Sequence, residues 1–303
     1  MKNQSPVQID EKSLLSVKEL TYDVLLKENR NQAYSHSGTA KSPFRTRGLD
    51  FQEIRAYQQG DDIRQIDWKT TAKHGGKPYT KLYTDEKEQP VYFVCDLRGT
   101  MKFASNGVFK SVIVARLAMF MAFLAERRQD RIGSVVLLEN EIKQADLQSN
   151  GGAMALMTDI LAGGEAIPKQ VDETTLEDAL SLLAKEVKTG AKIFILSDMH
   201  DLTEGAVEIL KRISFHRTVS LIQVYDKLEQ EMPEGLWAVT DGIHVSVANM
   251  TKKESQENFK ERFKKQFDFI QKAVDRNGWG YLPIQTTDDY ILTIISFVQM
   301  GGL

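Results

Sequence analysis

The chain has very little cysteine and no strong excess of charge of either sign. Its single cysteine, Cys95, has no second cysteine to pair with, so a disulfide scaffold and a cysteine-based zinc site are both excluded. A reducing compartment, the cytoplasm, is therefore the expected location. The formal net charge of -3 over 303 residues creates no overall field that would gather nucleic acid or an anionic membrane surface.

The sequence also lacks a long uninterrupted apolar run. The longest candidate, VIVARLAMFMAFLA, is interrupted by Arg116 and is shorter than the roughly 20 residues needed to cross a bilayer, so we predict a buried helix and no membrane insertion. The N-terminus, MKNQSPVQIDEKSLL, carries acidic residues where a signal peptide would be apolar, which argues against export. The motifs G-x-x-x-x-G-K-[ST], G-x-G-x-x-G, H-E-x-x-H and G-x-S-x-G do not occur, which argues against nucleotide hydrolysis by this chain alone.

The pattern of apolar and polar residues along the sequence changes near residue 88. Residues 1–88 contain an apolar stripe at helical spacing over 12–28, then a loop rich in small residues and a polar region with interleaved aromatics. Residues 89–303 alternate short apolar runs with helical patterns, which is typical of βαβ units. We therefore expect an N-terminal helix and a small region over 1–88, and over 89–303 an α/β domain with a doubly wound, mostly parallel sheet and helices on both faces.

The same patterns predict the individual elements of the larger domain. The expected strands are VYFVC, RIGSVVLL, KIFILS, TVSLIQVY and a late pair around LWAVT and IHVSV, and the expected helices cover 109–127, 154–161, 176–188, 204–213 and 254–276.

Acidic and hydroxyl side chains follow the ends of the predicted strands. Asp96 comes directly after VYFVC and Asp198 after KIFILS, while Thr174 and Thr175 precede a helix. Ligands collect at the carboxyl ends of parallel strands, and such oxygen atoms suit magnesium or manganese. The alternative is that these residues only cap helices and turn the backbone, which is their more frequent role.

A charged and aromatic motif precedes the larger domain. The segment RGLDFQEIRAYQQGDDIRQIDWKTTAK, followed by VYFVCDLRGTMKF, resembles the signature of the domain-of-unknown-function fifty-eight family of bacterial proteins, and the likeness extends in outline to the C-terminus. The motif brings no obvious nucleophile, so we favour a structural role: a turn at Gly60 and an ion-pair cluster of Arg64 with the neighbouring acids, holding the small region to the main domain. Its signature residues are Arg55, Tyr57, Gly60, Asp61, Asp62, Arg64, Asp67 and Trp68.

The resemblance implies a core similar to a von Willebrand factor type A domain, whose metal-ion-dependent adhesion site uses an Asp-x-Ser-x-Ser loop, a distant Thr and a further Asp. Asp96, Thr100, Thr174 and Asp198 match those positions and would be the ligands if any metal bound. Arg98 stands where the first serine should coordinate, and a guanidinium has no lone pair to offer. We therefore expect a degenerate site in which Arg98 replaces the ion and pairs with Asp96 or Asp198, with no cofactor and only a doubtful place for magnesium.

Three functions remain open at this point. The first is a non-enzymatic protein–protein interaction module; the resemblance implies that its partner is a MoxR-type AAA+ ATPase in protein remodelling or complex maturation. The second is a phosphatase of the haloacid dehalogenase kind, because DLRGT resembles the Asp-x-Asp-x-Thr loop with Asp96 as nucleophile. Arg98 counts against it, since arginine cannot transfer protons near neutral pH. The third is a structural assembly subunit without a remodelling partner.

Overall fold

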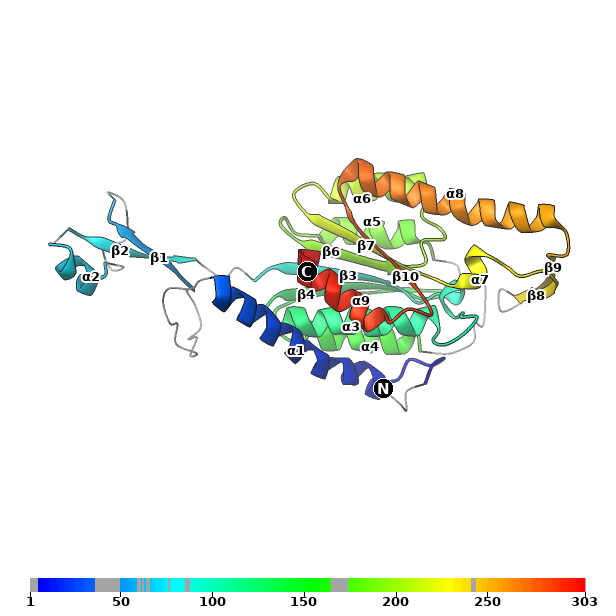
Figure 1. Cartoon of the computed structure of the whole chain (residues 1–303), viewed down its shortest axis with the longest axis horizontal. Coiled ribbons are helices and arrows are strands. Elements are labelled where there is room, and N and C mark those ends of the chain that lie inside the picture. The colour runs from blue at the N-terminus through cyan, green and yellow to red at the C-terminus, as the bar shows by residue number, and fades with distance from the viewer. Residues whose placement is uncertain are drawn as a thin grey trace. The chain divides into compact units, whose positions relative to one another are not determined.

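The computed structural model describes residues 5–35, 50–58, 61, 63, 66–75, 77–84, 88–164, 174–240 and 244–302 (Figure 1). The chain divides into two compact units, one formed by Met1–Ser35 with Gln89–Leu303 and the other by His36–Glu88. The predicted boundary after residue 88 therefore marks the end of the smaller unit. The N-terminal helix differs from the prediction, because it belongs to the larger unit and not to the small region.

A six-stranded sheet forms the centre of the larger unit. The strand order is β10-β7-β6-β3-β4-β5, and only β5 runs antiparallel to its neighbour. The central strands are apolar on both faces and buried, as strands covered by helices on both sides must be. The predicted mostly parallel sheet is thus confirmed. Its strands are β3 (Pro90–Asp96), β4 (Arg131–Leu137), β5 (Ile142–Gln148), β6 (Lys192–Ser197), β7 (Thr218–Tyr225) and β10 (Gly280–Gln285).

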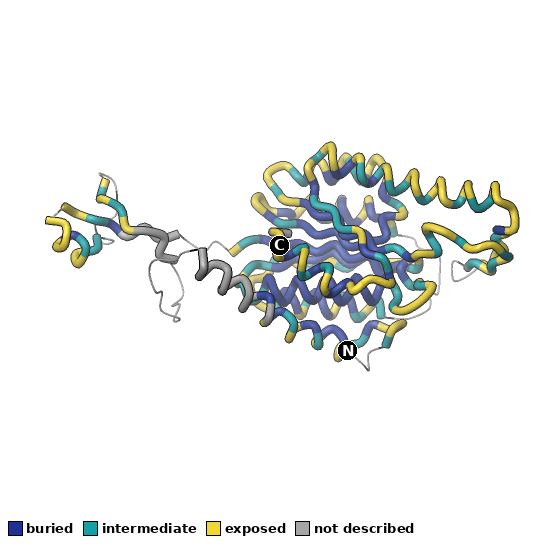
Figure 2. The backbone as a smooth tube through the Cα atoms, in the orientation of Figure 1, coloured by how far each residue is buried: buried dark blue, intermediate teal, exposed yellow. Residues whose placement is uncertain are grey.

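Helices cover both faces of this sheet (Figure 1), and each face has its own apolar core. Figure 2 shows the buried backbone concentrated in the sheet and in the helix sides turned toward it. The fold is therefore doubly wound. One face carries α1 (Glu11–Ser35), α3 (Lys110–Arg127), α4 (Gly152–Ala162) and α9 (Tyr290–Phe297), and the other carries α5 (Leu176–Glu186), α6 (Glu204–Ile213) and α8 (Lys253–Asn277).

Helix α3 is buried almost all round because α1 packs over the side that the sheet leaves open. Its buried arginine, Arg116, donates to Ser13 Oγ at 2.7 Å and to Tyr290 Oη at 2.8 Å, so it ties α1 and α9 to α3. The predicted buried helix is confirmed. In the part of the chain that the structure describes, none of the helices combines the length and the apolar character that a membrane crossing requires.

Some elements differ from the sequence prediction. The late strand pair lies outside the main sheet, as a separate antiparallel hairpin of β8 (Leu236–Thr240) and β9 (Val245–Asn249). Strands β5 and β10 were not predicted: β5 is a half-exposed edge strand, and β10 contains Pro283, which weakens a strand pattern. The short helix α7 (Lys227–Gln230), the 3-10 turn η2 (Gly99–Met101) and the C-terminal turn η3 (Val298–Gly302) complete the larger unit.

The described part of the smaller unit contains a two-stranded antiparallel sheet of β1 (Asp50–Ala56) and β2 (Tyr79–Thr84) and a short helix, α2 (Trp68–Lys73). Asp67 begins α2, because its carboxylate accepts the backbone N–H groups of Lys69 and Thr70.

Candidate functional site

The candidate site lies where the parallel strands end. We call it the carboxyl edge and define it by the segments Asp96–Lys102, Asp198–Asp201 and Asp226–Glu229, which lie at or directly after the ends of β3, β6 and β7. β3 and β6 are neighbours in the sheet with Cys95 opposite Leu196, so the residues that follow them emerge side by side. This is the position at which α/β sheets of this kind bind ligands.

Arg98 lies at the centre of the carboxyl edge and is held by two carboxylates. Its Nε donates to Asp96 Oδ1 at 2.9 Å and its Nη2 to Asp96 Oδ2 at 2.7 Å. Nη1 and Nη2 also donate to the two oxygens of Asp201, at 2.8 Å and 2.9 Å, and Nη1 donates to the carbonyl of Thr174 at 2.8 Å. These bonds use all five N–H groups that a guanidinium possesses.

The charges around Arg98 fix its protonation state. Burial by itself would lower the pKa of the guanidinium, but the hydrogen bonds and negative charges of Asp96 and Asp201 outweigh burial and raise it above its usual value. Burial would raise the pKa of Asp201, and the contact with Arg98 more than reverses this and lowers it. The guanidinium of Arg98 is therefore a permanent cation, and the lowered pKa keeps Asp201 ionised beside it.

Asp198 has a different cation, so of the two predicted partners of Arg98 the structure confirms Asp96. We expected Arg98 to pair with Asp96 or Asp198; the structure pairs it with Asp96 and Asp201, while Asp198 Oδ2 accepts Lys110 Nζ at 2.9 Å. Lys110 is fully buried and also contacts Glu229. Burial acts to raise the pKa of Asp198, but the Lys110 charge dominates and lowers it. The carboxyl edge thus contains two built-in cations in place of one.

The two predicted threonines make weaker contributions. Thr174 donates its hydroxyl to the Leu138 carbonyl at 2.6 Å and presents its own carbonyl to Arg98. Thr100 lies in the 3-10 turn and is exposed. Neither hydroxyl is held against Asp96. Thr175 is the N-cap of α5 and forms a capping box with Asp178, as the helix-capping alternative predicts.

The side chains of the carboxyl edge do not fit a divalent metal ion. Both oxygens of Asp96 are occupied, because Oδ1 accepts the Arg98 backbone N–H and Nε, and Oδ2 accepts Arg98 Nη2 and the Ser197 hydroxyl. Asp198 is occupied by Lys110. Among the residues that the structure describes, no group of three or more His, Cys, Asp or Glu side chains is arranged to hold a metal ion.

Several residues of the site were missed by the sequence reasoning. Asp201 lies three residues after Asp198 in SDMHD, and a second acid so close to a strand end was the available signal. Lys110 had no signal, because it sits at the start of an otherwise apolar helix. Asp226 joins three segments: its carboxylate accepts the backbone N–H groups of Ser105 and Leu228 and the hydroxyl of Thr286.

The signature residues lie in the smaller unit, and only some belong to the described part. Asp61 pairs with Arg55 at 2.8 Å, and Asp67 caps α2. The Tyr57 backbone N–H donates to the Pro78 carbonyl, and Trp68 is exposed. The predicted cluster around Arg64 cannot be followed, because Gly60, Asp62 and Arg64 lie outside the described residues.

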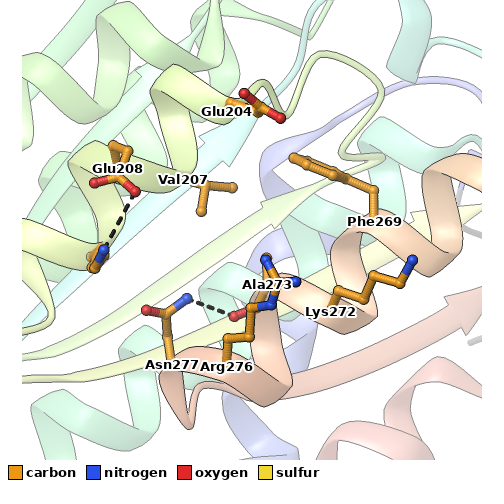
Figure 3. Close-up of a pocket in the computed structure, with 9 residues that line it drawn as sticks. Glu204, Val207, Glu208, Phe269, Lys272, Ala273, Arg276 and Asn277 are labelled. Atoms are coloured by element: carbon orange, nitrogen blue, oxygen red, sulfur yellow. Dashed lines mark hydrogen bonds and ion pairs between the residues drawn. The ribbon is translucent and has the colours of Figure 1, made fainter.

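Cys95 and a surface groove are two further features of the larger unit that bear on possible chemistry. Burial raises the pKa of the Cys95 thiol well above its usual value, so this cysteine is not a reactive thiolate. A groove of about 440 Å³ runs between α6 and α8 and contains none of the carboxyl-edge residues (Figure 3). Its walls mix both charge signs over an apolar floor and converge on no reacting centre. They are formed by Glu204, Val207, Glu208, Lys211, Phe269, Lys272, Ala273, Arg276 and Asn277.

The fold and the site together define an α/β protein with a doubly wound, mostly parallel sheet and a carboxyl edge filled by paired charges. A model of the family described as "Protein of unknown function DUF58" matches residues 53–271. The chain belongs to this family, as the signature segment predicted.

Relatives among curated proteins carry no assigned activity. "Uncharacterized protein Rv1480" of Mycobacterium tuberculosis and "Uncharacterized protein Mb1516" of Mycobacterium bovis are each 23% identical over 199 residues, which is 66% of this chain. The chain covers 61% of the length of these relatives.

Solved structures show a distant likeness. BatB from Bacteroides thetaiotaomicron is 15% identical with a TM-score of 0.42, over 71% of this chain and 98% of that one. An aerotolerance-related membrane protein from Bacteroides fragilis is 15% identical with a TM-score of 0.45, over 71% and 100% of the two chains. A von Willebrand factor type A protein from Catenulispora acidiphila is 10% identical with a TM-score of 0.38, over 73% and 43%.

Proposed function

We propose that this chain is a non-enzymatic protein–protein interaction module and that the carboxyl edge is its docking face. One observation carries the proposal: the guanidinium of Arg98 spends all five of its N–H groups on Asp96, Asp201 and Thr174. A side chain held in this way cannot move protons or receive a substrate. In this proposal the site is a degenerate metal-ion-dependent adhesion site in which Arg98 takes the place of the ion.

Titration calorimetry tests the replacement of the metal. The folded chain with magnesium is expected to give no saturable heat near neutral pH, because the Asp96 oxygens already accept four donors. Calcium or manganese in place of magnesium is expected to give the same flat trace. A clean one-site isotherm that disappears in Asp96→Asn would overturn the replacement.

The phosphatase alternative is disfavoured by the same geometry. An attacking carboxylate needs a free oxygen that can reach phosphorus, whereas Asp96 is fully buried and both of its oxygens are occupied. The assay is hydrolysis of a generic phosphate ester in the presence of magnesium. Turnover that Asp96→Asn abolishes would reverse the ranking of the two functions.

The partner we propose is a MoxR-type AAA+ ATPase in the cytoplasm, as the family resemblance implies. A tagged chain is cross-linked in its native cells, purified and analysed by mass spectrometry. The variant Thr100→Arg adds a bulky group at an exposed position of the carboxyl edge and is expected to reduce recovery of the ATPase. Thr158→Arg changes an exposed threonine of α4 in the same way and is the matched control. Equal recovery with both variants would remove the carboxyl edge from the proposal.

A further inference from the structure

Each of the two cations, Arg98 and Lys110, contacts one buried acid, Asp96 or Asp198, and a second acid that is more exposed than the cation. The side chain of Arg98 is 6% exposed and that of Asp201 is 29% exposed. Lys110 is 0% exposed and Glu229 is 34% exposed. The pair Lys102–Glu139, which lies after β3 and β4, repeats the pattern with 5% and 13%. The positive charges are therefore buried, and the charged groups of these pairs that reach solvent are carboxylates, chiefly Asp201 and Glu229.

The β8–β9 hairpin presents an apolar surface to solvent. Leu236 is 68% exposed, Val245 is 73% and Val247 is 67%. Ala238 lies opposite Val247 and Thr240 opposite Val245, and alternate residues of a strand share one side. Leu236, Ala238, Val245 and Val247 therefore form one face of the hairpin, which we call the hairpin face. A two-stranded sheet whose apolar side is left in water is poorly stabilised by itself.

We call the exposed carboxylates of Asp201 and Glu229 the acidic rim. The hairpin follows Glu229 closely along the chain. Glu229 belongs to α7, and β8 begins seven residues later, a span of at most about 25 Å for an extended chain. Glu231 binds Lys260 of α8 at 2.7 Å, and the Met250 N–H donates to the Gly235 carbonyl at the base of the hairpin. Acids also dominate this stretch, since residues 226–260 contain seven Asp and Glu against four Lys.

We propose that the hairpin face and the acidic rim of Asp201 and Glu229 together bind a basic amphipathic segment of a partner protein. This inference rests on the proposed function, because it assumes that the carboxyl edge is the docking face. The partner's apolar side chains would cover the hairpin face, and its Lys or Arg side chains would meet the rim carboxylates. The polarity is opposite to that of a metal-filled site, where the exposed centre is a cation and attracts an acidic ligand.

The same charges argue against other occupants. Nucleic acid and anionic membrane surfaces would both meet like charge at the rim. A second copy in a two-fold dimer would place one acidic rim near the other, because such an interface uses the same patch on both subunits.

The test is fluorescence anisotropy with the full chain and two labelled peptides. The first is an amphipathic peptide of Leu and Lys, and the second has every Lys replaced by Glu. The Leu–Lys peptide is expected to bind, and Val245→Ser/Val247→Ser is expected to weaken it at least about tenfold, because burial of two valines is lost. Leu236→Ser provides a second, independent variant of the hairpin face. Leu292→Ser removes an equally exposed leucine of α9 and is expected to leave the affinity unchanged within about twofold.

Four results would overturn the inference: no binding of the Leu–Lys peptide, equal binding of the Leu–Glu peptide, equal affinity of the hairpin and Leu292→Ser variants, or binding of phosphatidylserine vesicles through the hairpin face. Sedimentation that shows a dimer abolished by Val245→Ser/Val247→Ser would overturn it in favour of a second copy. The native cross-linking experiment separates this inference from the proposed function. If Thr100→Arg lowers partner recovery and the hairpin variants do not, only this inference fails; if none of them does, both fail.

Discussion

Arg98 is held by two carboxylates of unequal exposure, and this difference decides what each substitution costs. Asp96 is fully buried, whereas Asp201 keeps contact with water. When a buried carboxylate loses its cation, water cannot replace the lost stabilisation of its charge, whereas water can do so for a partly exposed carboxylate. The two halves of the cluster should therefore respond differently.

We predict that Arg98→Ser lowers the free energy of unfolding by about 3–5 kcal/mol, because it leaves the buried Asp96 side chain without its cation. Asp201→Asn should cost only about 1 kcal/mol, since Arg98 keeps Asp96 and the lost pair is partly in water. Urea unfolding near pH 7 measures both values. Equal losses for the two variants would show that Asp96 does not depend on Arg98.

A second prediction concerns pH. The pKa of Asp198 is lowered in the folded chain, so its contribution to stability is present above its unfolded pKa of about 3.9 and is lost as pH falls through the folded value. In Lys110→Met the carboxylate stays buried without its cation, and its folded pKa should rise above the unfolded one. The unfolding free energy of this variant is expected to increase as the pH is lowered from about 7 to 5.

The control for the pH measurement is Lys272→Met, which removes an exposed lysine of α8. Its pH profile should follow that of the parent chain. A Lys110→Met profile that also follows the parent chain would contradict the pairing of Lys110 with Asp198.

Sequence reasoning reached part of this charge cluster and missed the rest for physical reasons. Asp96 and Asp198 follow apolar runs, so strand ends could be located, and the lack of lone pairs on Arg98 excluded it as a ligand. The choice between Asp198 and Asp201 as its partner depends on how the loop after β6 turns, and spacing alone does not encode this turn. Lys110 is the first residue of α3, and only the packing of α3 in the folded chain brings it next to Asp198.

At the scale of elements, α1 is the helix whose role differs most from its prediction. The apolar stripe did predict a helix, but not that the helix covers α3. Leu14 and Val17 are buried in the core, while Leu15 points outward. Without α1, the apolar outer side of α3 would face water, so α1 is part of the larger unit and not an appendage.

We predict that Leu14→Ala destabilises the chain by about 2–5 kcal/mol, as a cavity-forming substitution in a packed core does. Leu15→Ala, one position further along the same helix, should change the stability by no more than about 0.5 kcal/mol. Both values come from urea unfolding. Similar small effects for the two variants would mean that α1 is not packed as described.

The strands show why edge elements are harder to predict than central ones. β3, β6 and β7 are mostly apolar and were recognised, since burial on both faces leaves a simple composition signal. β5 and β10 form the two edges of the sheet, and their half-exposed faces carry polar residues and Pro283. The late strands could be located, but nothing in them indicated that they pair only with each other.

At the scale of the whole molecule, the two compact units differ in how many segments of the sequence form them. Two separate segments of the sequence form the larger unit: residues 1–35 precede the smaller unit along the chain, and residues 89–303 follow it. The larger unit should therefore tolerate the replacement of the smaller one, but not the removal of its own N-terminal segment.

We predict that replacing residues 36–88 with a Gly/Ser linker preserves one cooperative unfolding transition of the larger unit, measured by circular dichroism. Deleting residues 1–35 should instead produce an aggregation-prone chain, because the outer side of α3 is exposed. Size-exclusion chromatography distinguishes the two products. A monomeric, cooperatively folding deletion product would show that the N-terminal segment is dispensable.

The ion pair at Arg98 also has a consequence for regulation. A metal-loaded adhesion surface can be switched off by a chelator and follows the concentration of free divalent ions around it. A cation that is attached to the backbone has no dissociation equilibrium, so it cannot be depleted or exchanged. If this face recruits a partner, it does so constitutively, and any control over recruitment has to come from the supply of the partner or from the neighbouring segments of the chain.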